Sequence, residues 1–169
     1  GGSGKSTSEM KTESTFSNHG WDLESRWAIN SGVNNGYPYL QSDPVFAGGT
    51  GTPEDPFKIE NGIQLNEIRN FLSSYFLLSN NIDISSFGYN FAEGWNPIGT
   101  SSAPFSGVLD GAGYVVIGLR VNRPTSSDIG LFGHVDNGTI KNVGLENVHV
   151  RGSDNTAALV GYLTNSSSI

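Results

Sequence analysis

A long repeat in the second half of the chain is the feature of this sequence that most restricts its fold. The stretch IGLFGHVDNGTI, which begins at Ile129, returns near the end of the chain as AALVGYLTNSSSI. The spacing from Leu131 to Leu159 equals that from Gly133 to Gly161, and only the last isoleucine is shifted by one position. A period of this length, made of two or three short strands, is what one coil of a β-solenoid requires, because a coil buries its apolar side chains only by stacking on its neighbours.

The rest of the second half has the same character. Residues 116–121 read VIGLRV and residues 140–150 read IKNVGLENVHV, which are short apolar runs interrupted by glycine or asparagine. Hydrophobic residues make up only 36% of the chain and charged residues 15%, while 23 glycines are present. Many short strands joined by tight turns account for this composition better than a helical bundle or a charged disordered tail. We therefore expect an all-β fold, a β-solenoid whose exposed ends need caps.

Prolines and glycines between residues 41 and 57 predict a boundary, since each interrupts regular strand pairing. We expect two domains, residues 1–45 and residues 46–169. In the second domain Asn61 is a suitable N-cap for a short helix near residues 62–72, which would cover one end of the solenoid. Its apolar residues at helical spacing are Ile63, Ile68, Phe71 and Leu72. The following stretch FLLSNNIDIS predicts a strand, a turn and a strand.

Several of these stretches resemble one family. GLFGHVDNGTIKNVGLENVHV and ALVGYLTNSSSI resemble the GLUG repeats of bacterial secreted and surface proteins, which are named for a Gly-Leu-x-Gly core. GGTGTPEDPFKIENGIQLNEIRNFL is similar to the opening of such repeat domains, and PIGTSSAPFSGVLDGAGYVVIGLRV to their first coils. Residues 1–40 resemble the usual closing segment, so that the closing segment here precedes the opening segment. The resemblance covers nearly the whole chain.

The resemblance implies a right-handed parallel β-helix within a large exported protein, such as an adhesin or the non-catalytic part of an immunoglobulin A protease. It implies an extracellular or cell-surface location and brings no catalytic residues. Two explanations of the inverted order remain open. The chain is either a window from a tandem array, in contact with adjoining modules, or a subunit whose first segment completes the open end of another copy, so that copies join head to tail into a filament.

Charge and composition exclude other classes of function. The net charge of −7 and the lack of a Lys and Arg cluster argue against nucleic acid as a partner. No apolar run approaches the length of a membrane span, and no export signal is visible at the start, so we expect neither insertion into a membrane nor a signal peptide of its own. Cysteine is absent, which removes disulfides, thiolate zinc sites and thiol catalysis.

The opening GGSGKST ends like a phosphate-binding loop, but the first glycine of that motif and its preceding strand would lie before Gly1. We instead expect Ser6 to Glu9 to form a capping box, in which Ser6 and Glu9 each bond the other's backbone amide. A short helical turn through Lys11 would follow.

Aromatic residues gather between residues 16 and 40, and the candidates for a binding surface among them are Trp21, Trp27, Tyr37 and Tyr39. They could form a platform for surface glycans or for self-association, or they could close the end of a core. Because large aromatic side chains usually serve packing, we expect the cap. Carbohydrate binding stays open as an alternative function.

The other alternative is a polysaccharide-degrading enzyme, since parallel β-helices also carry lyases and hydrolases. Such a site needs carboxylates together with Lys, Arg or His on one face. The candidates are His19, Asp22, Glu24, Arg26 and Asp110. The first four alternate with aromatic residues as solvated side chains would, and Asp110 before a glycine is ordinary turn chemistry. His134 and His149 have no clustered partner in the sequence, so we expect no enzyme activity.

We expect no cofactor. Calcium is left open, because Asp43, Glu54, Asp55 and Asp83 could supply oxygen ligands, but the sequence has no D-x-D-x-D-G loop and no glycine-aspartate nonapeptide repeat. Two glycosylation acceptor patterns begin at Asn137 and Asn165, as expected by chance in a chain so rich in asparagine and serine. The sequence therefore predicts a non-catalytic structural or adhesive module, part of a stalk or of a self-assembling filament.

Overall fold

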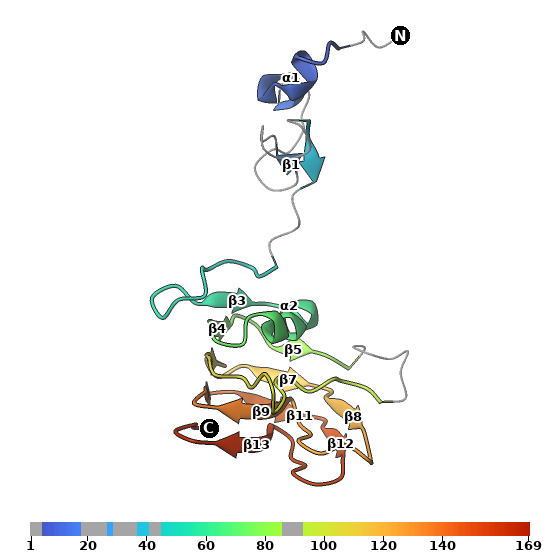
Figure 1. The fold of residues 1–169 in the computed structure, drawn as a ribbon, viewed down its shortest axis with the longest axis vertical. Helices are drawn as coiled ribbons and strands as arrows, with labels where there is room; N and C mark the ends of the chain where they lie inside the picture. Colours follow the sequence, from blue (N-terminus) through green and yellow to red (C-terminus); the bar gives the residue numbers. More distant parts are fainter. Residues whose placement is uncertain (1–4, 18–26, 29–36, 41–44, 86–92) are drawn as a thin grey trace. The chain divides into compact units, whose positions relative to one another are not determined.

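The computed structural model describes residues 5–17, 27–28, 37–40, 45–85 and 93–169. The chain divides into two compact units, Gly1–Val45 and Phe46–Ile169, named here unit 1 and unit 2 (Figure 1). The role of unit 1 as the closing segment of a β-helix stays a prediction.

Unit 1 begins with the expected capping box. The Ser6 amide donates to Glu9 Oε2 at 2.8 Å, and the Glu9 amide donates to Ser6 Oγ at 3.3 Å. The short helical turn follows, and two further elements form an antiparallel pair in which Trp27 lies opposite Leu40. The described elements of unit 1 are the 3-10 helix η1 (Glu9–Lys11), α1 (Glu13–Ser17), β1 (Trp27–Ala28) and β2 (Tyr39–Leu40).

Unit 2 consists mostly of short strands, because its apolar residues come in short runs that glycine, asparagine or proline soon ends. These strands are β3 (Phe57–Ile59), β4 (Tyr75–Leu78), β5 (Ile82–Asp83), β6 (Val108–Asp110), β7 (Val115–Ile117), β8 (Arg120–Asn122), β9 (Phe132–Asp136), β10 (Thr139–Lys141), β11 (Gly144–Glu146), β12 (His149–Arg151) and β13 (Val160–Thr164). The all-β class is confirmed.

Most strands of unit 2 pair in parallel with strands about one repeat away in the sequence, whereas β3 and β4 are closer, with Phe57 opposite Phe76. The sheet orders are β10-β6-β4-β3, β11-β7-β5, β12-β8 and β13-β9. Val160 lies opposite Phe132, which is the spacing that the repeat predicts. Gly144 lies opposite Val115 and His149 opposite Arg120, and in both of these pairs the spacing is longer by a single position. The strands β10 to β13 thus form a last layer that lies on the layer of β6 to β9 (Figure 1).

The helix predicted near residues 62–72 is present but shorter. It consists of α2 (Gly62–Glu67) followed by the 3-10 turn η3 (Ile68–Asn70), and Asn61 caps it by accepting from the Gln64 amide at 3.0 Å. Leu65 and Ile68 are fully buried, whereas Ile63 is 66% exposed. The expected apolar face was therefore partly wrong, because Ile63 lies two residues before Leu65 and so on nearly the opposite side of the α-helix.

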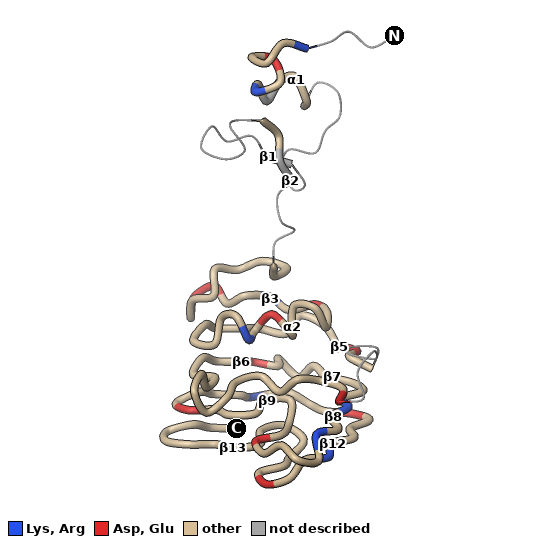
Figure 2. The backbone as a smooth tube through the Cα atoms, turned by 45° about the vertical axis from the view of Figure 1, so that its right-hand side comes forward, with Lys and Arg blue, Asp and Glu red and all other residues tan. Residues whose placement is uncertain are grey.

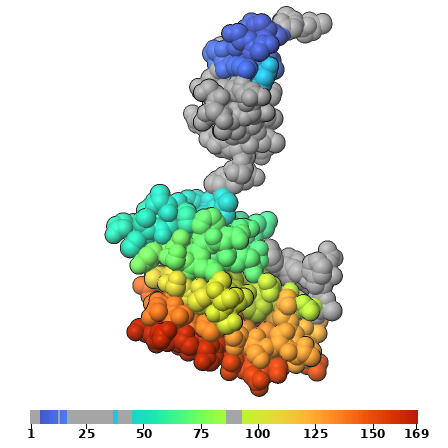
Figure 3. All heavy atoms as spheres, in the orientation of Figure 1, coloured from blue at the N-terminus to red at the C-terminus, as the bar shows by residue number. Residues whose placement is uncertain are grey.

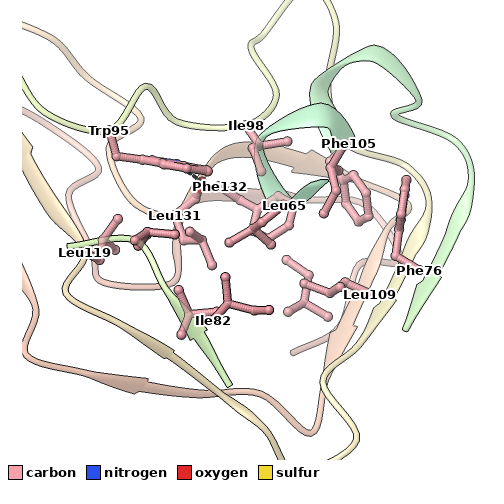
Figure 4. Packing of buried hydrophobic residues seen from close by; sticks show 14 of the residues in the cluster. Leu65, Phe76, Ile82, Trp95, Ile98, Phe105, Leu109, Leu119, Leu131 and Phe132 are labelled. Carbon is pink, nitrogen blue, oxygen red and sulfur yellow. Dashed lines mark hydrogen bonds between the residues drawn. The ribbon is translucent and has the colours of Figure 1, made fainter. Parts of the chain in front are cut away.

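The core of unit 2 is a stack of apolar side chains from successive layers (Figure 4). A column of phenylalanines shows this best. The ring centroids of Phe76 and Phe105 are 6.2 Å apart, and those of Phe105 and Phe132 are 4.9 Å apart. All three rings are almost completely buried. Each layer thus supplies side chains that the next layer covers, which is the source of stability in stacked β architectures.

Candidate functional site

The last layer exposes side chains that are buried at equivalent positions one layer earlier. Leu145 of β11 lies opposite Val116, which is completely buried, yet Leu145 itself is only half-buried. Leu163 of β13 lies opposite Val135, and it is 40% exposed where Val135 is fully buried. In Figure 3 the last residues (red) form the outer end of unit 2, away from the end formed by residues 46–60 (cyan). This end presents an apolar, uncovered layer.

The chain itself begins to cover this layer. Ser168 forms a parallel bridge with Thr139, and the Ile140 amide donates to the Ser168 carbonyl oxygen at 3.0 Å. Ile169 follows one repeat after Ile140, but it is 66% exposed where Ile140 is fully buried. Strands β10, β11, β12 and β13 each stand at the end of their sheet order. Such edges carry backbone groups that can pair with another strand.

Asp110, the last residue of β6, contacts the turn that follows β10, which is a corner of the last layer. Its Oδ1 accepts from the Ala112 amide at 2.9 Å and from Asn142 Nδ2 at 3.0 Å, while Lys141 Nζ lies 3.2 Å from Oδ2. The Ala112 amide, with smaller contributions from Asn142 and Lys141, lowers the pKa of the Asp110 carboxyl, although partial burial opposes this. The expectation of turn chemistry at Asp110 is confirmed. An open hollow of about 680 Å³ lies beside this corner and reaches Leu159 and Ile169.

The same corner arrangement recurs at another turn of the stack. Asn165 donates through Nδ2 to Asp136 Oδ1, just as Asn142 does to Asp110. Asn142 has a φ of 55° and Asn165 a φ of 53°. Asparagine tolerates this left-handed region better than most residues because its short amide can bond locally. Stacked Asp and Asn pairs therefore fix the turns that separate the strands.

The aromatic candidates of unit 1 lie partly outside the described residues. Trp21 is not among the described residues, while Trp27 and Tyr39 belong to the paired strands β1 and β2. Tyr37 is half-buried, and Lys11 Nζ lies 4.8 Å from its ring centroid. The use of these residues as a surface for glycans or self-association stays a prediction.

The histidines have neighbours that the sequence did not indicate. His134 Nδ1 lies 3.5 Å from Asp128 Oδ2, and Asp128 also accepts from Asn155 Nδ2 at 2.8 Å. The His134 ring is 4.8 Å from that of Tyr162, which lies opposite it on β13. His149 lies opposite Arg120. Tyr162 and Arg120 lie one repeat away in the sequence from the histidines that they contact or face, and Asp128 lies in the turn before β9. The pairing register between strands is therefore needed to identify these neighbours.

The remaining candidates are dispersed or not described. The cluster His19, Asp22, Glu24 and Arg26 and the calcium candidate Asp43 lie outside the described residues. Asp83 Oδ1 accepts from the Ser85 amide at 2.8 Å, and hydrogen bonds from Ser85 lower the pKa of this carboxyl. Within the described ranges no three His, Cys, Asp or Glu side chains gather as a metal ion would need. In the same ranges no helix has both the length and the apolar character of a membrane span.

Comparison with known proteins gives two relatives and one solved structure. No protein-family model matches the chain. The chain is 38% identical over 123 residues to a protein of Evansella cellulosilytica named "Putative Gly-rich membrane protein", and 32% identical over 123 residues to "Halomucin" of Haloquadratum walsbyi. These matches cover 71% and 67% of this chain but only 14% and 1% of the relatives. The chain therefore spans a small part of the proteins it matches.

The solved structure is that of a "putative immunoglobulin A1 protease" from Bacteroides ovatus. The match covers 73% of this chain and 66% of the other, with 15% identity and a TM-score of 0.39. A likeness at this level carries no inference about fold or function.

Proposed function

We propose that unit 2 is a right-handed parallel β-helix of the GLUG-repeat type and that the chain is a non-catalytic structural module of a cell-surface or extracellular protein. In this module a further layer stacks on β10 to β13. The parallel registers, each of which joins strands about one repeat apart, support the β-helix. The relative named as a membrane protein, which is far longer than this chain, supports the location and a modular role.

The observation that carries the proposal is the loss of burial in the last layer. Leu145, Leu163 and Ile169 repeat the positions of Val116, Val135 and Ile140, which are fully buried. Full burial of a Val, Leu or Ile side chain contributes about 1.5–3 kcal/mol relative to leaving it exposed. A further layer would gain this energy at several positions and pair the strand edges as well. That layer comes either from adjoining repeats of the same protein, as in a stalk, or from another copy, as in a filament.

The experiment that tests assembly between copies is the mass of the isolated chain against concentration, followed by electron microscopy of the concentrated sample. We expect the mass to rise with concentration and regular filaments to form. Leu163→Lys places a charge on the uncovered layer and should keep the chain monomeric. Glu146→Gln raises the net charge by the same single unit at an exposed, outward side chain of the same layer and should leave assembly unchanged.

A wild-type chain that stays monomeric at every concentration contradicts the filament and leaves the stalk. Equal loss of assembly in Leu163→Lys and Glu146→Gln contradicts stacking on this layer, because the effect would then come from net charge alone.

A further inference from the structure

A basic groove lies on the outer surface of the sheet formed by β8 and β12. It has a volume of about 340 Å³ and is lined by Arg120, Val121, Asn122, His149, Val150 and Arg151. Figure 2 shows Lys and Arg positions (blue) at these two strands. No acidic residue is among the six that line it. We call these six residues the basic groove.

The strand register explains why the polar side chains share one face. Alternate residues of a strand point to opposite sides of a sheet. Val121 is buried in the core, so Arg120 and Asn122 on either side of it point outward. On β12 the same alternation turns His149 and Arg151 outward. His149 lies opposite Arg120, and Arg151 opposite Asn122, so the two arginines are diagonal neighbours on one surface.

The positive charge of the groove is not balanced locally. Among the described residues, neither Arg120 nor Arg151 nor His149 forms an ion pair. Arg123, which follows Asn122 in the sequence, does form an ion pair, with its Nη1 2.8 Å from Glu93 Oε2. The whole chain carries a net charge of −7. Arg120 and Arg151 are thus two exposed arginines that pair with none of the described carboxylates, in a protein that is acidic as a whole. The positive potential around them attracts anions.

We propose that the basic groove binds an acidic polysaccharide, through the carboxylate or sulfate groups on its sugars. An arginine guanidinium matches the planar, two-oxygen geometry of a carboxylate and also bonds sulfate oxygens. His149, which lies opposite Arg120, can bond sugar hydroxyl groups. This role is separate from the proposed stacking of layers and from the aromatic candidates of unit 1.

The charge of the whole molecule favours a polysaccharide over nucleic acid. Duplex DNA carries a charge about every 1.7 Å of its axis, and proteins that bind it neutralise several phosphates at once. The groove offers two arginines and one histidine, and the remainder of an acidic chain would repel the neighbouring phosphates. A polysaccharide with one acidic group on each sugar has more widely spaced charges, so the acidic chain repels it less than it repels duplex DNA.

The test measures binding of the full chain to four probes at low salt. These are polygalacturonate, which carries carboxylates, dextran sulfate, neutral dextran and a short DNA duplex. We expect binding to one or both acidic polysaccharides, and binding should weaken as salt is added. Polygalacturonate and dextran sulfate distinguish the carboxylate from the sulfate as the preferred group. Equal binding of neutral dextran, or stronger binding of DNA, would overturn the proposal.

Variants separate the groove from net charge. Arg120→Gln with Arg151→Gln should reduce affinity by at least roughly tenfold, since charge-assisted hydrogen bonds are among the stronger polar contacts. Lys5→Gln with Lys58→Gln removes the same charge from two exposed positions outside the groove and should change affinity by less than about twofold. Equal losses in the two double variants would overturn the proposal. Arg120→Lys with Arg151→Lys, which keeps the charge, should restore part of the affinity, and the thermal unfolding of each variant shows that it is folded.

Discussion

At the scale of single residues, the repeated glycine is explained by the space it occupies. A Cβ atom added to Gly133 would lie 2.7 Å from the carbonyl oxygen of Gly99 and 2.8 Å from that of Asp128. One added to Gly161, at the same position of the next layer, would lie 2.4 Å from the backbone nitrogen of Ile129. Backbone of a neighbouring segment passes too close to admit any side chain. Glycine at this position of the repeat is therefore required by packing.

Gly133→Ala should lower the free energy of unfolding by about 1–3 kcal/mol, because backbone on two sides must move to admit the methyl group. Gly144→Ala is the matched control. A Cβ atom at Gly144 would meet only the side chain of Val115, at 3.2 Å. The substitution should therefore lower the free energy of unfolding by less than about 1 kcal/mol. Urea unfolding of both variants checks this, and a Gly133→Ala variant as stable as Gly144→Ala would refute the packing requirement.

Neighbours one layer apart were the hardest residues to predict. The sequence showed Asn61 as a helix cap and Ser6 with Glu9 as a capping box, since each depends on contacts within a single helical turn. It did not show that Arg120 lies opposite His149. That contact depends on the register between two layers. The sequences of β7, β8, β11 and β12 are too loosely similar to predict this register.

At the scale of elements, α2 contributes to the core through few side chains. Leu65 is fully buried, and Ile68 of η3 is as well, while Ile63 is 66% exposed. Sequence periodicity predicted the helix and its start correctly, but it assigned Ile63 to the buried face. The expected face joined Ile63 to Ile68, which is five residues further on, and residues at that spacing do not share one face of a helix. Leu65 and Ile68 are three residues apart and do share a face, which is the face that packs on the core.

Leu65→Ala should lower the free energy of unfolding by about 2–5 kcal/mol, as expected for a leucine removed from a packed core. Ile63→Ala, in the same helix, removes a largely exposed side chain and should change stability by less than about 0.5 kcal/mol. Thermal or urea unfolding compares the two. If both variants lose the same stability, the helix is held by its own propensity and not by its packing on unit 2.

At the scale of the whole molecule, unit 2 is a stack in which each layer covers the one before it. The all-β class and the spacing that places Val160 opposite Phe132 could be predicted from the sequence, because stacking requires equal spacing of equivalent residues. An open end was also expected from the sequence, but the side chains that it exposes could not be predicted in this way. Leu145 and Val116 have the same apolar character, and only the number of layers around each decides its burial.

The most direct measurement is the unfolding of a chain to which one further layer is added. The segment from Lys141 to Ile169 is repeated once after Ile169, which continues the register that pairs Ser168 with Thr139. The control carries one additional glycine at the junction, which shifts the register by a single position and turns the inward side chains outward.

The stacked-layer account predicts that the added layer folds on β10 to β13. The urea midpoint should rise, the dependence of unfolding free energy on urea should steepen as more surface is buried, and the added residues should resist proteolysis. The out-of-register control should gain none of these. An in-register layer that is cleaved as readily as the control, with an unchanged midpoint, would contradict the account.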